Sequence, residues 1–172
     1  MKGRIRLRAM EPEDLDVLYQ IENDPGTWCV GVVNVPYSRY LLHDYIANAT
    51  GDIYADKQVR LMIENVEGAC VGMVDLVNFD PRHSRAEVGV VIQERYRRRG
   101  YATEALRLAL DYAREVVHLH QVYGVISVEN EVSLKLFKSL GFEDGAVLKD
   151  WLHANDTYRE AYLLQYFFQK RA

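Results

Sequence analysis

A basic turn that contains one glycine joins a strand pattern to a helix pattern in the middle of this chain. The strand pattern at 86–92 is mostly apolar and rich in valine, and apolar residues recur at helical spacing over 102–113. Between them lies Arg97-Arg98-Arg99-Gly100-Tyr101-Ala102. The first helical turn presents unpaired amides and a positive dipole end, and a glycine lets an anion approach the backbone closely. This strand–turn–helix unit therefore predicts a phosphate or pyrophosphate site, to which the arginines add charged donors.

The composition indicates one globular domain spanning residues 1–172. Of the 172 residues 49% are hydrophobic, which is enough to bury a core. The formal net charge of −4 argues against nucleic acid as a general partner. The arginine run stands out against this acidic background, and a solvated basic turn without a ligand is its alternative interpretation.

The sequence carries no signal for export, a membrane span or a metal centre. Cys29 and Cys70 lie far apart, without the spacing of a metal or redox pair. No apolar run is long enough to cross a bilayer, and the N-terminus lacks the apolar core of a signal peptide. We therefore expect a cytoplasmic protein with free thiols, no membrane partner and no metal.

Strand and helix patterns follow one another along the whole chain. Strands are expected at 5–8, 59–65, 70–79, 86–92, 122–128, 142–152 and 158–168, and helices at 12–23, from Ser38, from Ala102 and at 130–140. Asp24-Pro25-Gly26 is expected to end the first helix, and Ser38 to cap the second. A strand-rich first half followed by a βαβα order implies an α/β (α+β) chain with a mixed sheet covered by helices.

Two motifs in order make the chain similar to the GNAT family of acetyl-CoA-dependent N-acetyltransferases. Arg97-x-x-Gly100-x-Ala102 resembles the family's Q/R-x-x-G-x-G/A pyrophosphate loop, and Asn130 to Phe142 resembles its N-x-x-S/A-x-x-L/Y-Y-x-x-L-G-F helix. The resemblance implies the GNAT fold, a mixed and mostly antiparallel sheet of about seven strands flanked by helices.

Within the family, the chain looks most similar to bacterial spermidine/spermine N-acetyltransferases and ribosomal-protein N-terminal acetyltransferases. The segments 5–9, 13–15, 85–87 and 155–159 carry this likeness. It implies transfer of an acetyl group from acetyl-CoA to a primary amine by direct attack in a ternary complex, with a polyamine as the favoured acceptor. A peptide N-terminus or an amino sugar is an alternative acceptor, and a non-catalytic CoA-binding sensor domain is the alternative function.

The same resemblance implies which residues hold acetyl-CoA. Its pantetheine arm would pair like an extra strand with 90–92, its pyrophosphate would meet 97–103, and the second motif would contact the rest. The implied cofactor-binding residues are Val90, Val91, Ile92, Arg97, Arg98, Arg99, Gly100, Tyr101, Ala102, Thr103, Asn130, Ser133, Phe137 and Lys138. Helix capping by Asn130 and core packing by Phe137 are the alternatives.

Acetyl transfer needs a neutral amine, so a group must take the proton of the ammonium form. Glu87 is the candidate catalytic base, because it lies in an apolar strand, where it shares a face with Gly89 and Val91. The alternative is an ion pair between Glu87 and Arg82 or Arg85.

Asp75 and Trp28 are expected to bind the acceptor together with Glu87. The alternatives are a solvent-facing Asp75 and a core position for Trp28. The segment 30–35 is apolar, which weakens the polyamine interpretation and admits a peptide N-terminus or a small amine. The tyrosine-rich strand at 158–168 alternates enough to place one face in the core. We expect a homo-oligomer, for which pairing through this strand is one option.

The second motif departs from the family at one position. Many members carry a tyrosine where this chain has Phe137, and its hydroxyl protonates the leaving thiolate. Water, the ammonium proton or the hydroxyl of Tyr101, Ser133 or Tyr162 would then do this work, or turnover would be slow.

Overall fold

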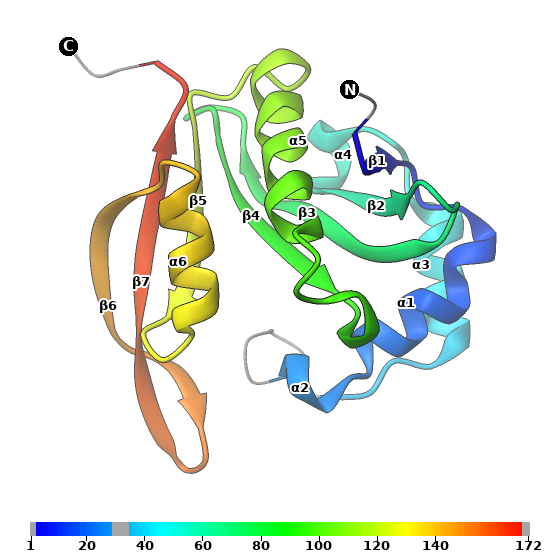
Figure 1. The fold of residues 1–172 in the computed structure, drawn as a ribbon, viewed down its shortest axis with the longest axis horizontal. Coiled ribbons are helices and arrows are strands. Elements are labelled where there is room, and N and C mark those ends of the chain that lie inside the picture. Colours follow the sequence, from blue (N-terminus) through cyan, green and yellow to red (C-terminus); the bar gives the residue numbers. More distant parts are fainter. Residues whose placement is uncertain (1–2, 29–34, 170–172) are drawn as a thin grey trace.

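A seven-stranded sheet organises the residues that the computed structural model describes, 3–28 and 35–169 (Figure 1). Its strand order is β1-β2-β3-β4-β5-β7-β6. Neighbouring strands are antiparallel except β4 and β5, which are parallel. The predicted mixed and mostly antiparallel sheet is confirmed.

The elements lie close to where the sequence patterns predict them. The strands are β1 Ile5–Arg8, β2 Val59–Asn65, β3 Cys70–Asp80, β4 Arg85–Ile92, β5 Gln121–Ser127, β6 Glu143–Ala154 and β7 Thr157–Phe167. The helices are α1 Leu15–Glu22, α2 Pro25–Trp28, α3 Arg39–Asn48, α4 Ile53–Asp56, α5 Tyr101–Glu115 and α6 Glu131–Ser139, with 3₁₀ turns at Pro12–Asp14 and Glu94–Tyr96. None of the helices in the described ranges is long and apolar enough to cross a bilayer.

Two short helices differ from the expectation. The first helix ends before Asp24, as expected, but Pro25 then starts α2, which was not expected, because proline suits the first position of a helix. Helix α4 was not expected, since four residues are too few for a periodic pattern. It begins where the backbone N–H of Tyr54 donates to the Asp52 carboxylate at 2.9 Å. The predicted cap at Ser38 is confirmed, with its hydroxyl accepting from the Leu41 amide at 3.1 Å.

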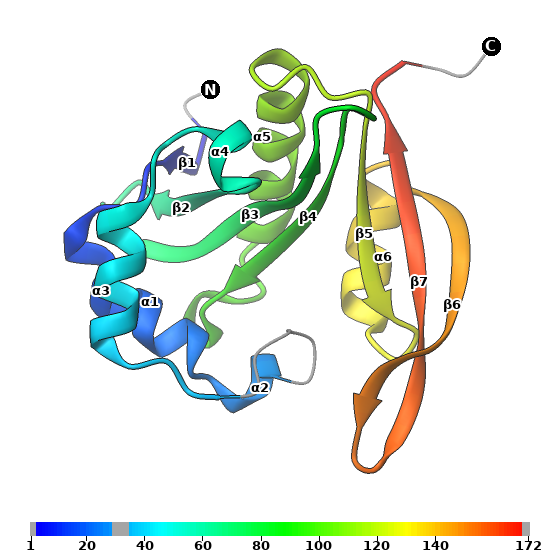
Figure 2. The ribbon, with the colours of Figure 1, turned by 180° about the vertical axis from the view of Figure 1, so that it is seen from behind.

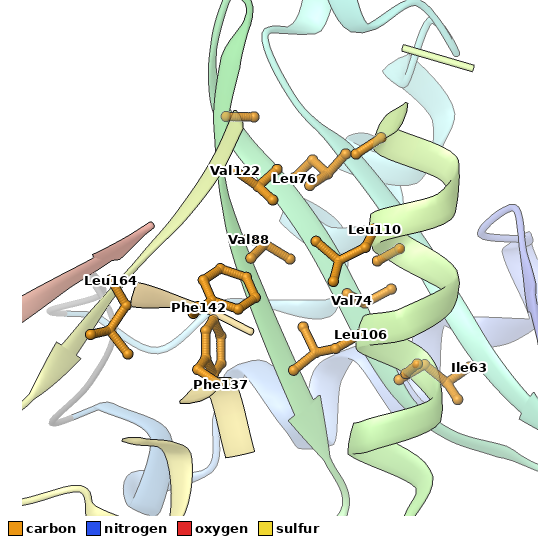
Figure 3. Close-up of a cluster of buried hydrophobic side chains, with 14 of the residues drawn as sticks. Ile63, Val74, Leu76, Val88, Leu106, Leu110, Val122, Phe137, Phe142 and Leu164 are labelled. Carbon is orange, nitrogen blue, oxygen red and sulfur yellow. The ribbon is translucent and has the colours of Figure 1, made fainter. Parts of the chain in front are cut away.

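Helices cover both faces of the sheet, so both faces carry apolar side chains. Helices α5 and α6 lie on one face, and α1 and α3 lie on the other (Figures 1 and 2). Under α5 and α6 the core includes Ile63, Val74, Leu76, Val88, Leu106 and Leu110 (Figure 3). On the opposite face, Leu18, Ile21 and Leu42 pack on Met62 and Met73. We call this second side the α1/α3 face.

The C-terminal strand does not offer the edge that the sequence suggested for pairing with another subunit. Strand β7 pairs with β5 on one side and with β6 on the other, because the β6–β7 hairpin folds its last strand back into the sheet. The outer strand is β6, on which Val147 and Trp151 are exposed.

A buried ion cluster ties the first strand to the first helix. The Asp14 carboxylate is almost inaccessible and accepts two hydrogen bonds from the Arg8 guanidinium, at 2.7 and 2.8 Å, and one from the Glu11 amide at 2.8 Å. Arg8 also binds Glu64 on β2 at 2.6 Å. Burial raises the pKa of Asp14, but the bonds from Arg8 and Glu11 outweigh it and hold that pKa below its usual value.

Replacing Asp14 should therefore destabilise the fold strongly. Asp14→Asn removes one of the two carboxylates that Arg8 binds and leaves a neutral amide in a buried position, and we expect the free energy of unfolding in urea to fall by about 3 kcal/mol at neutral pH. Because the folded-state pKa is lowered, the contribution of Asp14 is present above its unfolded pKa of about 3.9 and is lost as the pH falls further. The difference between the variant and the wild type should therefore shrink in acid.

The matched control is Asp16→Asn, which removes an exposed carboxylate that pairs with Arg39. Its effect should stay within about 0.5 kcal/mol. Equal losses for the two variants would contradict the role assigned to Asp14.

Candidate active site

Strands β4 and β5 start as a pair and then separate. Within the described residues their parallel pairing joins Arg85 to Gln121, Ala86 to Val122 and Glu87 to Tyr123, and it stops there. Strand β5 continues its pairing with β7 as far as Ser127. Figure 1 shows the two strands diverging beyond this point, which we call the fork. Strand β4 is thus left with an open edge over 88–92, which includes Val90, Val91 and Ile92.

An open strand edge can bind an extended ligand, because every second residue turns its N–H and C=O toward the missing neighbour. One carbonyl of this edge already has a partner, since Arg97 Nε donates to the Ile92 oxygen at 3.0 Å. The arginine thereby holds the end of β4 against the turn that follows it. The open edge and the basic turn form one continuous surface.

The turn that follows β4 has the backbone of an anion site. Arg98 and Gly100 both have left-handed backbones, with φ of 61° and 79°, and Gly100 is the N-cap of α5. The backbone amides of Tyr101, Ala102 and Thr103 open this helix, and such amides have no partner within the helix. The predicted strand–turn–helix unit is confirmed, and phosphate binding by it stays a prediction.

Arg4 also belongs to this turn, which the sequence analysis missed. Its guanidinium donates to the Arg99 carbonyl at 2.9 Å and to Glu104 at 3.3 Å. A Cβ placed on Gly100 would lie 2.7 Å from Arg4 Nη2 and would displace this flexible side chain, while the left-handed backbone at Gly100 itself favours glycine. Position 4 is far from the turn in sequence, and no local pattern could have placed it there.

Glu87 lies at the fork on the α1/α3 face. Asn78 approaches it from a bulge in β3, where the register with β4 shifts and Asn78 takes a φ of 52°. Asn78 Nδ2 donates to Glu87 Oε2 at 2.8 Å. The expected alternative, an ion pair of Glu87 with Arg82 or Arg85, is not found within the described residues, and Arg85 instead binds Asp80 at 3.2 Å. Burial raises the pKa of Glu87, and the bond from Asn78 opposes that rise.

Asp75 lies on the same face but already has a cationic partner. Its two oxygens accept from Arg60 Nε and Nη2, each at 2.8 Å, and Arg60 Nη1 binds Glu22 at 2.5 Å. Arg60 is largely buried, with 17% of its side chain exposed. The three groups carry a net charge of −1, so this cluster attracts a cation less strongly than two free carboxylates would.

Gly89 leaves open space between these groups. It pairs with Asp75 across β3 and β4, and it lies two residues after Glu87 in β4, on the same face of the sheet. A Cβ placed on Gly89 would meet no described atom within 4 Å. The structure therefore brings Glu87 and Asp75 to one face around an open position.

Of the motif residues on and before α6, one caps the helix and another packs in the core. Asn130 caps the helix, since its side chain accepts from the Ser133 amide at 3.2 Å. Phe137 is buried with its ring centre 4.8 Å from that of Phe142 (Figure 3). Lys138 binds Asp144 at 2.9 Å. Both alternative interpretations, the cap and the core position, are present in the fold, while cofactor contacts by these residues stay a prediction.

The predicted role of Trp28 in binding the acceptor stays a prediction. Trp28 is the last residue of α2, which lies near the wide end of the diverging strands in both views (Figures 1 and 2). Its side chain falls outside the described residues, as does the segment 29–34.

Tyr123 is a further residue of the fork that the sequence analysis missed. Its parallel partner is Glu87, and in-register neighbours of a sheet point to the same face. Burial raises the pKa of Tyr123, and the nearby Glu87 carboxylate adds to the rise. The signal available in the sequence was the alternation of 121–127, in which Val122, Gly124 and Ile126 are buried and Tyr123 faces the other way.

Comparisons with known proteins show which proteins this chain is similar to. A family model described as Acetyltransferase (GNAT) domain matches residues 4–143. Spermidine N(1)-acetyltransferase of Escherichia coli strain K12 is 29% identical over 164 residues, which cover 91% of this chain and 82% of that protein. The putative ribosomal N-acetyltransferase YdaF of Bacillus subtilis strain 168 is 29% identical over 171 residues, covering 97% and 92%.

The fold has solved relatives as well. Spermidine N-acetyltransferase from Vibrio cholerae, crystallised in complex with CoA and spermine, matches with a TM-score of 0.83 at 23% identity over 95% of both chains. This likeness confirms the predicted fold.

The contact between Asn78 and Glu87 leads to a test of the site's electrostatics. Asn78→Gly removes the donor but tolerates the left-handed backbone, so the pKa of Glu87 should rise further above its usual value. Carbon-13 NMR titration of the glutamate carboxyls measures it, with the Glu87 signal assigned from Glu87→Gln.

Asn155→Gly is the control, because Asn155 has a φ of 50° in the distant β6–β7 turn. An unchanged Glu87 pKa in Asn78→Gly would show that the hydrogen bond is not formed in solution.

Proposed function

This chain belongs to the GNAT family of acetyltransferases, and from that premise we propose that it acetylates a primary amine of a polyamine such as spermidine or spermine. It is an N-acetyltransferase and uses acetyl-CoA as the acetyl donor. The observation that carries the proposal is the fork, where an open strand edge leads from a basic turn to a carboxylate of raised pKa.

The residues around the fork fit the donor. The α5 amides at 101–103 and the guanidinium groups of Arg4 and Arg97 offer donors to a pyrophosphate. The open edge of β4 offers backbone groups to the amides of a pantetheine arm. When bound, acetyl-CoA supplies an acetyl group activated as a thioester. Ser133 and Lys138 on α6 are proposed to contact it from the other side of the fork.

Glu87 is proposed as the general base. An alkyl amine with a pKa near that of lysine is neutral in only about one molecule in two thousand at pH 7. A carboxyl of raised pKa is the better acceptor for the ammonium proton, because its affinity for protons is closer to that of the amine. Glu87 would take this proton at its carboxylate while the amine attacks directly in a ternary complex.

The acceptor is proposed to lie over Gly89, between Glu87 and the Asp75–Arg60–Glu22 cluster. Both sides of that space are negative overall, which suits a ligand with several positive charges. The similarity to the spermidine acetyltransferase of E. coli supports a polyamine. Trp28 remains a proposed part of this pocket.

A peptide N-terminus is the second candidate acceptor. The pairing of Asp75 with Arg60 removes part of the negative charge that a polyamine would need. The sequence identity to the putative ribosomal N-acetyltransferase equals that to the spermidine enzyme, at 29%, and the match covers 97% of this chain. An assay panel separates the two candidates.

We also propose a homo-oligomer, in which the outer edge of β6 takes part. Trp151 and Val147 are 57% and 50% exposed there, and large apolar side chains on an unpaired edge strand favour association.

The function is tested by thiol release from acetyl-CoA with polyamines, short peptides and amino sugars as acceptors. Acceptor-dependent release should be highest with polyamines. Glu87→Gln should lower turnover by about 10²- to 10⁴-fold, because the base is lost, while the Kd for CoA measured by calorimetry stays the same.

Glu67→Gln is the control, since Glu67 is exposed in the β2–β3 turn. CoA binding without acceptor-dependent release by the wild type would contradict the proposal and favour a sensor domain. A preference for peptides would replace the polyamine by the second candidate.

A further inference from the structure

The departing sulfur needs a proton, and Phe137 has no hydroxyl to supply it. The need for this proton rests on the proposed function, acetyl transfer from acetyl-CoA. The hydroxyls considered from the sequence all lie on the side of the sheet that α5 and α6 cover. Tyr101 and Ser133 belong to those two helices, and Tyr162 pairs with Ile126, a core residue of that side. Glu87 lies on the opposite face, because it alternates with the core residue Val88.

Tyr123 carries a hydroxyl on the same face as Glu87. The two residues form the last parallel pair before β4 and β5 separate. Tyr123 alternates with the buried Val122 and Gly124, so it points away from α6. On its other side, the β7 residue in register with it is the uncharged Gln165. The fork thus places one carboxyl and one phenol side by side.

The open edge of β4 starts immediately beyond this pair. A pantetheine arm held by the basic turn and laid along 88–92 runs toward Glu87 and Tyr123, over about 13 Å at the usual rise of a strand. The acyl end of the donor is therefore directed at the fork. The acceptor space over Gly89 opens on the same face.

We propose that Tyr123 replaces the missing tyrosine of α6, with its Oη giving the proton that the departing sulfur takes up and Glu87 returning a proton to Tyr123. The ammonium group of the acceptor first gives one proton to Glu87. As the C–N bond forms and the C–S bond breaks, the electron pair of the C–S bond stays on sulfur, which takes the Tyr123 proton. Glu87 then reprotonates Tyr123, and the second amine proton leaves to water. Both side chains return to their starting states.

The charges at the fork suit this exchange. Burial is the largest cause of the raised pKa of Tyr123; Glu87 and Asp80 add to it, and Arg85 opposes them. When Glu87 takes the amine proton, its contribution disappears and the phenol becomes a stronger acid. The hydroxyl thus stays protonated in the resting enzyme and is more acidic when the sulfur departs.

Tyr123→Phe in the full-length chain tests the inference. With a saturating polyamine and acetyl-CoA, we expect kcat to fall by about 10²-fold or more, while KM and the Kd for CoA change less than about twofold. The alkaline limb of the kcat profile, which reports the loss of the Tyr123 proton, should disappear. Tyr54→Phe, which removes an exposed hydroxyl on α4, should behave as the wild type.

A second measurement needs neither substrate. In protein labelled with carbon-13 at tyrosine Cζ, the resonance missing from Tyr123→Phe identifies Tyr123. Its pKa should fall in Glu87→Gln, because the nearby negative charge is gone. The Glu67→Gln control should leave this pKa unchanged.

Three outcomes would overturn the inference. The first is an unchanged kcat in Tyr123→Phe. The second is a loss of CoA binding in that variant, which would make the hydroxyl structural. The third is a Tyr123 pKa that is the same in Glu87→Gln as in the wild type. If the wild type acetylates amines while any of these holds, only the role of Tyr123 fails. If the wild type shows no acceptor-dependent thiol release, the proposed function itself fails.

Discussion

The separation of β4 from β5 is the constraint on which the rest of the site depends. Within the described part of the chain, a parallel pair that stops after Glu87 and Tyr123 leaves backbone groups of β4 without a strand partner in the middle of a sheet. The fold tolerates this because each half has its own support. Strand β4 is held by β3 along its length and covered by α5, while β5 is held by β7. The edge of β4 therefore stays open between the two halves of the sheet.

Polar side chains of the site lie at the narrow end of this opening. The bulge in β3 brings Asn78 to Glu87, and the parallel register brings Tyr123. At the wide end, Arg97 holds the β4 carbonyl at Ile92, and Arg4 joins the turn from the far end of the chain. A cosubstrate that lies along the strand would therefore have its anionic part at one end and its reactive part at the other.

The sequence was a good guide wherever the signal was local. The strands β2 and β3, the cap at Ser38 and the strand–turn–helix unit around Gly100 all lie where the patterns predict them. Contacts between distant segments had no such signal. Arg60 takes both oxygens of Asp75, an ion pair that no spacing in the sequence indicates. The β4–β5 register, which places Tyr123 beside Glu87, exists only once the sheet has formed.

The central claim, that the open edge of β4 binds the acetyl donor, is tested most directly by amide hydrogen exchange with and without CoA. The account predicts slower exchange on CoA addition at alternate amides over 88–92 and at the α5 amides of 101–103. The exposed β6–β7 turn at Asn155 should not change. Protection confined to other segments, with 88–92 exchanging as in the free protein, would contradict the account.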